Sequence, residues 1–224
     1  MSDFDKFSSD YENILDKKIK YFGESTEYFA EYKAEYVRKY LGDDFKGRIL
    51  DYGCGIGLIV KYLKQYFDKN NVEIMGYDVS LESTKRANQE MPDIVFTHDF
   101  NKIKKNNFDV IVLANVLHHV KPEERSVFIR KAKSFLVKGG RIFIFEHNPY
   151  NPLTRLIVKL CVFDKEVIIL KRKETVKLLI EAGMNISEKR YIVFFPQILK
   201  MFRFLEPILG CVPMGTQYLC IGKV

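Results

Sequence analysis

The stretch Ile49-Leu50-Asp51-Tyr52-Gly53-Cys54-Gly55-Ile56-Gly57 (ILDYGCGIG, residues 49–57) decides how this chain is interpreted. It begins as an apolar run, stops at an acid and then places glycine at three alternate positions. This pattern is typical of a β-strand that leads into a ligand-binding turn, because glycine lets the backbone approach a ligand closely and adopt positive φ. The carboxylate of Asp51 beside the turn is its unusual feature.

The glycine spacing and this carboxylate separate two classes of ligand. The dinucleotide fingerprint G-x-G-x-x-G requires glycine at position 58, where this chain has Leu58. A carboxylate at the turn repels a diphosphate and attracts an ammonium group. S-adenosylmethionine carries an ammonium and a sulfonium and no phosphate. We therefore interpret the turn as a site for S-adenosylmethionine, with S-adenosylhomocysteine as the product, and keep an NAD enzyme as an alternative.

Strand and helix patterns alternate outward from this stretch. Strands are expected at 48–52, 72–78, 94–100, 108–116 and 139–147 (the last after a Gly139–Gly140 turn), and helices at 57–67, 81–90, 122–137 and 173–182. This alternation predicts an α/β fold with a mostly parallel sheet covered on both faces. The last two strands, 185–195 and 216–224, have no helical crossover between them and are expected to pair antiparallel.

The chain reads as a single domain over residues 1–224, because it contains no repeat, low-complexity tract or linker. We expect an N-terminal helical cover (1–45), a cofactor-binding core (46–148) and an acceptor-side segment with the terminal strand pair (149–224). The roughly twenty residues after residue 195 are too long for a plain turn, and such connections are often lids or binding segments.

Composition sets broad limits on function. Apolar residues make up 47% of the 224 residues and charged residues 29%, which indicates an ordinary globular protein. The net charge of +7 would suit RNA, an anionic membrane surface or a phosphorylated substrate, but the lysines are scattered, as on solvated helix faces. With no membrane-spanning run, no secretory signal and no disulfide-type cysteine spacing, we expect a cytoplasmic protein for which peripheral membrane contact stays open. We expect no metal site.

The motifs ILDYGCGIG, MGYDVS, THDF, FDVIVLANVLHHV and LVKGGRIFIFEH follow one another in this order. Over about residues 47–148 the chain thereby resembles the class I S-adenosylmethionine-dependent methyltransferases. The resemblance implies a Rossmann-like three-layer sandwich, with a seven-stranded sheet of order 3-2-1-4-5-7-6 whose last strand is antiparallel. The flanking stretches YFAEYKAEYV, EHNPYNPLTR and PMGTQYL resemble a small-molecule branch found among methyltransferases of cell-surface polysaccharide biosynthesis.

The same resemblance implies roles for individual residues. It assigns the methionine moiety to Asp51, Tyr52, Gly53, Cys54, Gly55, Gly57 and Asn115, the ribose to Asp78, and the adenine to Val79, Asp99 and Phe100. A loop-capping role for Asp99 is the alternative. From the residues themselves, the aromatic N-terminal segment, with Tyr11, Tyr21, Tyr28 and Tyr32, is a candidate cover for the sulfonium through cation–π contact.

Catalysis is expected at the ends of the fourth and fifth strands. Asn115 is not followed by the two prolines typical of amino-methyltransferases that act on bases, which disfavours that class. His118 and His119, with Glu146 and His147, are candidates for deprotonating an acceptor hydroxyl, since imidazole titrates near neutral pH. The alternative is that one histidine of the first pair packs in the core and the other caps a helix.

Two apolar segments, 149–170 and 196–212, carry Arg155, Lys159, Lys200 and Arg203. We consider them a pocket for an anionic or lipid-linked sugar, or else packing against the sheet. The leading interpretation is a methyltransferase for a small-molecule acceptor, such as a hydroxyl of a sugar or lipid-linked precursor. RNA or protein methylation and a non-catalytic cofactor-binding subunit are the alternatives. The sequence does not specify the acceptor, the methylated atom or the oligomeric state.

Overall fold

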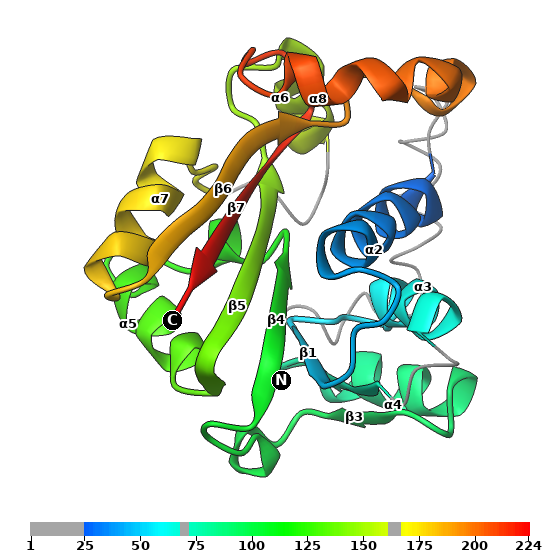
Figure 1. The fold of residues 1–224 in the computed structure, drawn as a ribbon, viewed down its shortest axis with the longest axis vertical. Helices are drawn as coiled ribbons and strands as arrows, with labels where there is room; N and C mark the ends of the chain where they lie inside the picture. Colours follow the sequence, from blue (N-terminus) through cyan, green and yellow to red (C-terminus); the bar gives the residue numbers. More distant parts are fainter. Residues whose placement is uncertain (1–24, 68–71, 161–166) are drawn as a thin grey trace.

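The computed structural model describes residues 25–67, 72–160 and 167–224, and it has a central sheet with helices on both faces (Figure 1). The strands are β1 (Arg48–Tyr52), β2 (Glu73–Tyr77), β3 (Val95–Thr97), β4 (Phe108–Ala114), β5 (Leu136–His147), β6 (Asn185–Ile192) and β7 (Gln217–Lys223). Their order is β3-β2-β1-β4-β5-β7-β6, with β1 to β5 paired in parallel and β7 antiparallel to both of its neighbours. The predicted Rossmann-like topology is confirmed.

Helices cover the two faces of this sheet. The helices of the described residues are α2 (Thr26–Leu41), α3 (Leu58–Phe67), α4 (Leu81–Glu90), α5 (Arg125–Lys133), α6 (Pro152–Leu160), α7 (Arg172–Glu181) and α8 (Glu206–Leu209), with 3₁₀ turns η1 (Phe100–Lys102), η2 (Leu117–His119) and η4 (Gln197–Leu205), and α6, α8 and η4 lie at one end of the sheet (Figure 1). Side chains of β4 alternate between the layers: Val110 and Val112 pack with α2 and α3, whereas Ile111 and Leu113 pack with α5 and α7. Burying each such side chain stabilises the fold by roughly 1.5–3 kcal/mol.

Helix α2 closes one side of the molecule and is fastened by a row of tyrosines. Ser25 caps its start by accepting a hydrogen bond from the Tyr28 backbone, and it ends at Gly42, whose φ is +86°. The hydroxyls of Tyr28, Tyr32 and Tyr36, spaced four residues apart on one helical face, donate to the Phe195 carbonyl and to the carboxylates of Glu206 and Glu188. The tyrosine row therefore joins the N-terminal cover to β6 and the segment that follows it. Tyr11 and Tyr21 lie outside the described residues.

Two sequence expectations about the fifth strand were wrong. The helix predicted over 122–137 is limited to α5, because Leu136 already pairs with Phe108 as the first residue of β5. The glycine pair predicted as a turn before the strand lies inside it, where the register with β4 shifts. Gly139 has φ +81° there, so the local turn is present but as an irregularity within a longer strand.

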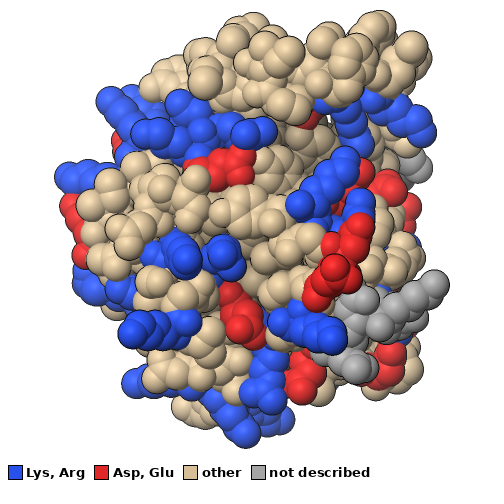
Figure 2. Space-filling model, in the orientation of Figure 1, with Lys and Arg blue, Asp and Glu red and all other residues tan. Residues whose placement is uncertain are grey.

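The connection between β6 and β7 neither packs fully against the sheet nor forms a plain loop. It forms η4 and α8, which lie at one end of the molecule together with α6 (Figure 1). Most of residues 197–214 are exposed. Elsewhere on the face in Figure 2, basic and acidic side chains are interspersed. No helix in the described residues is long and apolar enough to cross a membrane.

Candidate active site

A cavity of about 760 Å³ opens at the carboxyl ends of the parallel strands, where open α/β sheets bind their ligands. The turn after β1, the end of β2, the residues after β4 and His147 of β5 form its floor. Phe29, Ala30 and Lys33 of α2 form one wall, and Leu153, Thr154 and Pro196 also line the cavity. Its volume lies in the range of about 300–1,000 Å³ typical of small-molecule sites.

The glycine turn forms a cradle on the cavity floor. A Cβ at Gly53 would lie 2.4 Å from a methyl group of Val116, so a side chain does not fit there. Gly55 has φ +53° and open space around its would-be Cβ, and its backbone lines the cavity. Tyr52 and Cys54 also line the cavity, and the Tyr52 ring stacks on Tyr77 at a centroid distance of 5.0 Å.

Asp78 lies at the end of β2 and is held in place by the backbone. Its two carboxylate oxygens accept hydrogen bonds from the amides of Gly55 (2.8 Å) and Ser80 (2.9 Å). These bonds fix the carboxylate at the cavity edge, as a partner for ligand hydroxyls requires. The neighbouring Val79 lines the same cavity with its side chain 63% exposed, which makes it an apolar surface available to a flat ring.

Asp51 is the most unusual group in the cavity wall. It is 1% exposed, and neither of its carboxylate oxygens has a hydrogen-bond partner among the described residues. Burial, and secondarily the charge of Asp78, raises its pKa to about 7, while Lys33 opposes the shift. A buried carboxylate without partners is costly, so the site is suited to a cationic or hydrogen-bond-donating ligand group.

Lys33 of α2 is a buried ammonium in the same wall. Burial lowers its pKa to about 8, although the charges of Glu146 and Asp51 counteract this effect. It has no hydrogen-bond partner among the described residues and therefore remains available to a ligand. Sequence analysis missed this residue, although a lysine at position 33 interrupts the buried face of an otherwise apolar helical pattern.

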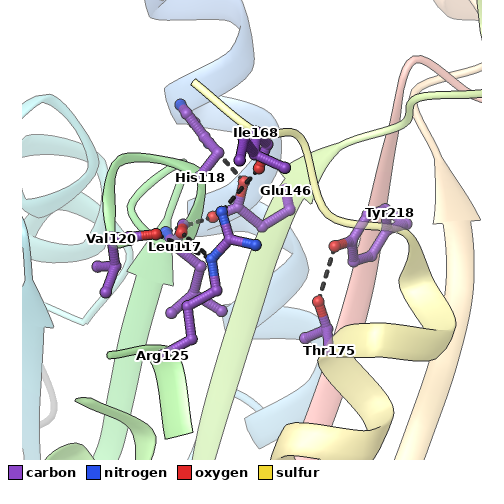
Figure 3. Close-up of polar contacts among 8 residues, drawn as sticks. All are labelled: Leu117, His118, Val120, Arg125, Glu146, Ile168, Thr175 and Tyr218. Carbon is purple, nitrogen blue, oxygen red and sulfur yellow. Dashed lines mark hydrogen bonds and ion pairs between the residues drawn. The ribbon is translucent and has the colours of Figure 1, made fainter. Parts of the chain in front are cut away.

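His118 and Glu146 form a buried pair at the wall of the cavity (Figure 3). The distance between His118 Nδ1 and Glu146 Oε2 is 2.6 Å, and the other Glu146 oxygen accepts a hydrogen bond from the Leu117 amide at 2.7 Å. Burial disfavours the charge of Glu146, but the His118 charge and hydrogen bond, with His147 and the Leu117 amide, outweigh it and lower the pKa of this carboxyl. His118 lines the cavity, and Glu146 lies behind it.

The η2 turn that carries His118 is held by a buried arginine. Arg125 Nε donates to the carbonyls of Leu117 (3.0 Å) and Val120 (2.9 Å), and its Nη2 donates to the Ile168 carbonyl (2.8 Å), as Figure 3 shows. Nothing in the sequence analysis singled out Arg125. It lies one turn beyond the predicted histidines, at the first position of α5, where its side chain reaches back to their loop.

The remaining predicted histidines surround this pair. The ring of His118 lies 4.2 Å from that of His119 and 5.1 Å from that of His147, measured between centroids. Both neighbours also line the cavity, and His119 is exposed whereas His118 is buried. The structure therefore brings together the four residues predicted for catalysis. Among the described residues, no group of three or more His, Cys, Asp or Glu side chains is arranged to hold a metal ion.

Two further polar side chains in the cavity wall have unpaired oxygens. Asn115 Oδ1 and Gln217 Oε1 are buried without hydrogen-bond partners among the described residues. Gln217 pairs with His147 across β5 and β7, which puts it beside the histidine at the end of β5. Its isolated position at the start of an apolar strand was the feature in the sequence that could have revealed it.

Unusual backbone conformations occur at two places in the wall. Asn115 and Val193 both have φ +58°, and this conformation is strained for a β-branched residue such as Val193. The Val193 carbonyl accepts hydrogen bonds from the amide and the hydroxyl of Thr216, at 3.0 and 3.2 Å. These two bonds hold the strained residue in the wall.

Four residues predicted to bind the cofactor do not line the cavity. The Asp99 carboxylate caps η1 by accepting from the Asn101 amide, as the capping alternative expected, and the Phe100 ring packs on Tyr77, Phe135 and Lys131. Gly57 lies behind the turn against Phe96. Tyr28 points away from the cavity, to the Phe195 carbonyl and beneath the guanidinium of Arg203. For Asp99, Phe100 and Tyr28, packing or capping engages the side chain that the sequence assigned to the ligand.

The proposed basic acceptor pocket also differs from the expectation. Arg155, Lys159, Lys200 and Arg203 do not line the cavity. Arg203 instead lies over the rings of Tyr28 and Tyr32, at 4.4 and 4.8 Å from their centroids, and the other three are exposed. Lys33 is the buried cation of the cavity.

Comparison with known proteins agrees with this geometry. Residues 50–144 match the family model described as a methyltransferase domain. The chain is 31% identical over 150 residues to an uncharacterized methyltransferase from Staphylococcus carnosus, covering 65% of this chain and 67% of that protein. It is 32% identical over 123 residues to the ribosomal RNA small subunit methyltransferase C of Actinobacillus pleuropneumoniae, covering 52% of this chain but 37% of that protein.

A solved structure shares the fold over most of its length. The crystal structure of a SAM-dependent methyltransferase from Archaeoglobus fulgidus superposes with a TM-score of 0.68 at 13% identity, covering 89% of this chain and 95% of the other. The strand order, the ligand cavity at the strand ends and the family match point to the same assignment. The chain belongs to the class I S-adenosylmethionine-dependent methyltransferases.

Proposed function

We propose that this methyltransferase acts on a hydroxyl group of a small-molecule acceptor, with His118 as the general base and Glu146 as the residue that orients it. The observation that carries the proposal is the buried His118–Glu146 pair at the cavity wall, with a 2.6 Å contact between them. Hydroxyl acceptors must lose a proton during methyl transfer, so a positioned base near the cavity is the group that such a reaction requires.

The cofactor half of the cavity fits S-adenosylmethionine, which supplies the electrophilic methyl group when bound. Asp51, with its unpaired buried oxygens, is the proposed partner of the cofactor's ammonium, and Asn115 supplies a second unpaired acceptor. Asp78, fixed by two backbone amides, is the proposed partner of the ribose hydroxyls. Val79 offers an apolar surface to the adenine, while Asp99 and Phe100 are engaged elsewhere.

The direction of proton transfer follows from the charge of Glu146. Because the pKa of Glu146 is lowered, the ionised carboxylate accepts a hydrogen bond from Nδ1–H of His118, and that proton stays on the ring. The other ring nitrogen, Nε2, is then the basic one, and it is directed away from Glu146. When Nε2 takes the acceptor proton, the carboxylate stabilises the resulting imidazolium, and the Leu117 amide keeps the carboxylate in place.

Lys33 and Gln217 are the proposed contacts for the rest of the acceptor. The ammonium of Lys33 interacts with the charges of both Asp51 and Glu146, so it lies between the cofactor half and the catalytic half of the cavity. A polar or anionic acceptor group there would gain a charged hydrogen bond that the free protein does not make. Gln217 offers an unpaired carbonyl oxygen beside His147.

RNA methylation is the second candidate, because one relative is named a ribosomal RNA methyltransferase. Two observations favour a small acceptor. The cavity volume falls in the small-molecule range, and on the face in Figure 2 acidic and uncharged side chains lie between the groups of basic ones. The asparagine after β4 is followed by Val116 and Leu117, not by the two prolines typical of base amino-methylation.

The decisive experiment follows a labelled methyl group from S-adenosylmethionine into a panel of sugar nucleotides, lipid-linked sugars, small phenols and bulk RNA. We expect label in a small molecule, at an oxygen, and none in RNA. With that acceptor, His118→Gln should lower kcat by about 10²–10⁴-fold while leaving S-adenosylhomocysteine affinity unchanged. Glu146→Gln should lower kcat by about 10²-fold or more, because the imidazolium loses its counter-charge.

Matched histidine variants identify the base. His98 is exposed and lies outside the cavity lining, so His98→Gln is the control and should retain wild-type kcat. His119→Gln and His147→Gln should reduce kcat less than His118→Gln, since neither residue makes the 2.6 Å contact with Glu146 that activates His118. Label in RNA, or full activity of His118→Gln, would contradict the proposal.

A further inference from the structure

The end of the molecule formed by η4, α8 and α6 carries a concentration of exposed apolar side chains. Ile198, Met201, Phe204 and Ile208 are 86%, 73%, 71% and 79% exposed, and Leu153 and Leu156 of α6 are exposed as well. We call these six residues the apolar cap. Large apolar side chains exposed in a cluster of this kind usually mark an interaction surface.

The parts of the cap belong to one surface. The side chain of Asn151 donates to the Met214 carbonyl at 2.6 Å, and the Thr154 hydroxyl donates to the Thr216 carbonyl at 2.8 Å. These bonds tie the start of α6 to the chain that follows α8. Figure 1 shows α6, α8 and η4 together at the same end of the molecule.

Within the two segments that carry the cap, the exposed charges have a single sign, although Glu35 of α2 lies 3.9 Å from Arg203 of η4. In the described ranges 149–160 and 197–214 the only acidic residue is Glu206, which is buried and bonded to the Tyr32 hydroxyl and the Phe194 amide. Arg155, Lys159 and Lys200 are exposed there. Figure 2 shows the upper end of the molecule as mostly uncharged, with basic side chains along its border.

We propose that the apolar cap is a docking surface for anionic lipid bilayers, on which this methyltransferase lies as a peripheral membrane protein. Exposed Phe, Ile, Leu and Met side chains flanked by Lys and Arg are the composition of segments that bury their apolar face at a bilayer interface. Basic side chains at the border meet the negative surface potential of the lipid headgroups, and no exposed acid in these ranges opposes it.

A second copy of the chain fits this surface less well. In a two-fold dimer the same patch faces itself, so Arg155, Lys159 and Lys200 would approach their own copies. The two segments provide no exposed acid to pair with them. An anionic bilayer attracts these three basic side chains, whereas a second copy of the chain repels them, and the geometry therefore points to lipid.

Docking by the cap does not depend on the proposed function, but it has a consequence for it. Leu153 belongs both to the cap and to the cavity wall, and Pro196, which also lines the cavity, directly precedes η4. The cavity therefore borders the surface that would face the bilayer. If the proposed hydroxyl methylation is correct, an acceptor anchored in the membrane reaches the cavity without crossing open solvent.

The test is vesicle flotation with the full-length protein. We expect binding to vesicles of phosphatidylcholine with about one-third phosphatidylglycerol, weakened about tenfold in pure phosphatidylcholine and at high salt. Ile198→Ser combined with Phe204→Ser should lower binding about tenfold by removing apolar contact, and Lys200→Glu should lower binding to anionic vesicles only. Ile180→Ser is the matched control, since Ile180 is 57% exposed on α7, outside the cap.

Three results would overturn docking on anionic lipid. One is failure of the wild type to float with anionic vesicles, and another is equal binding to neutral and anionic vesicles. The third is a concentration-dependent dimer in lipid-free solution that the Ile198/Phe204 double variant abolishes. Calorimetry with S-adenosylhomocysteine shows whether each variant is folded. Since flotation uses no acceptor, its failure would leave the hydroxyl-methylation proposal intact, and failure of that proposal would leave the flotation result intact.

Discussion

The carboxylate of Asp51 links cofactor binding to pH. With a pKa of about 7, Asp51 is largely protonated at pH 6, and an ammonium group beside it would favour the ionised form. We therefore expect S-adenosylhomocysteine binding at pH 6–6.5 to release a proton and to strengthen as the pH rises toward 7.5. Calorimetry in buffers of different ionisation enthalpy measures this release.

The control for this prediction is Asp51→Asn, which has the same shape and no titration in this range. It should bind the cofactor product at least about tenfold more weakly and release no proton, since a charged hydrogen bond is lost. Equal proton release by the wild type and by Asp51→Asn would show that another group titrates and would contradict the assignment.

Asn115 requires a different substitution, because its backbone has φ +58°. Asn115→Gly keeps this conformation available and removes only the amide, whereas Asn115→Ala also adds strain of roughly 1–2 kcal/mol. Both variants should weaken S-adenosylhomocysteine binding, but only the alanine variant should lower the free energy of unfolding appreciably. Calorimetry and urea denaturation separate the two effects. Unchanged affinity in the glycine variant would remove Asn115 from the cofactor site.

Among the elements, the η2 turn depends on Arg125, whose guanidinium bonds three backbone carbonyls. Arg125→Lys cannot satisfy all three, so we expect a loss of about 1–3 kcal/mol in unfolding free energy. Because the same turn positions His118, kcat should fall about tenfold or more while KM changes little. Arg130→Lys is the control: Arg130 is on the same helix and exposed, and among the described residues its guanidinium bonds only the Ser126 hydroxyl. Equal effects of the two variants would contradict this positioning role.

Helix α2 depends on the tyrosine row. Tyr32→Phe leaves the buried carboxylate of Glu206 without its hydroxyl donor and should destabilise the protein by about 1–3 kcal/mol. The helix also carries Lys33, Phe29 and Ala30 into the cavity wall, so cofactor affinity should fall in parallel. Urea denaturation and calorimetry measure the two quantities. Tyr40→Phe is the control, because the Tyr40 ring packs on Phe143 and its hydroxyl has no hydrogen-bond partner among the described residues. A Tyr32→Phe protein as stable as this control would contradict the role of the row.

At the scale of the whole molecule, the buried carboxylate of Asp51 lowers the free energy of unfolding when no cofactor is bound. Because the pKa of Asp51 is raised from 3.8 to about 7, the folded protein keeps a proton on Asp51 at pH values at which the unfolded chain has lost it. The free energy of unfolding therefore falls as the pH rises from about 4 to 7. Above pH 7, Asp51→Asn should therefore be more stable than the wild type by roughly 2 kcal/mol in cofactor-free protein, since the amide is buried without a charge. Thermal denaturation at pH 7.5 measures the difference.

Bound S-adenosylhomocysteine should make the wild type more stable than Asp51→Asn. At a hundred times its Kd, S-adenosylhomocysteine stabilises the wild type by about 2.7 kcal/mol, which corresponds to a rise in Tm of roughly 5–10 °C for a chain of this size. The Asp51→Asn variant should show a much smaller rise. A variant that is neither more stable alone nor less responsive to the ligand would contradict the stated role of Asp51.

The strands of the sheet could be predicted from the sequence because burial gives them a simple residue pattern. Val110, Ile111, Val112 and Leu113 are apolar on both faces, as a strand covered by two helical layers must be, and the glycine turn after β1 has few alternative conformations. The start of β5 was mispredicted because residues 134–138 have no strong preference, and their pairing with β4 decides the outcome.

The side chains around the cavity were less predictable. Asp51 lies near the end of β1, and Asp78 and His118 follow the ends of β2 and β4, whose positions in the fold are fixed by topology. Phe100 and Tyr28 were assigned to the ligand from their chemistry, but tertiary packing and backbone hydrogen bonds engage them elsewhere. Lys33 stands on the buried face of α2, but the tertiary hydrogen bonds of the tyrosine row help to set where that face lies, and the sequence did not show that it lines the cavity.

The strained backbone of Val193 has a consequence for enzyme engineering. Widening a binding site by truncating a buried valine normally costs about 2–3 kcal/mol in lost packing. At position 193, glycine also relieves a left-handed conformation worth roughly 1–2 kcal/mol, so much of that cost is offset. Variant libraries that widen the cavity can therefore begin at Val193, where truncation costs less stability than at a valine with ordinary backbone angles.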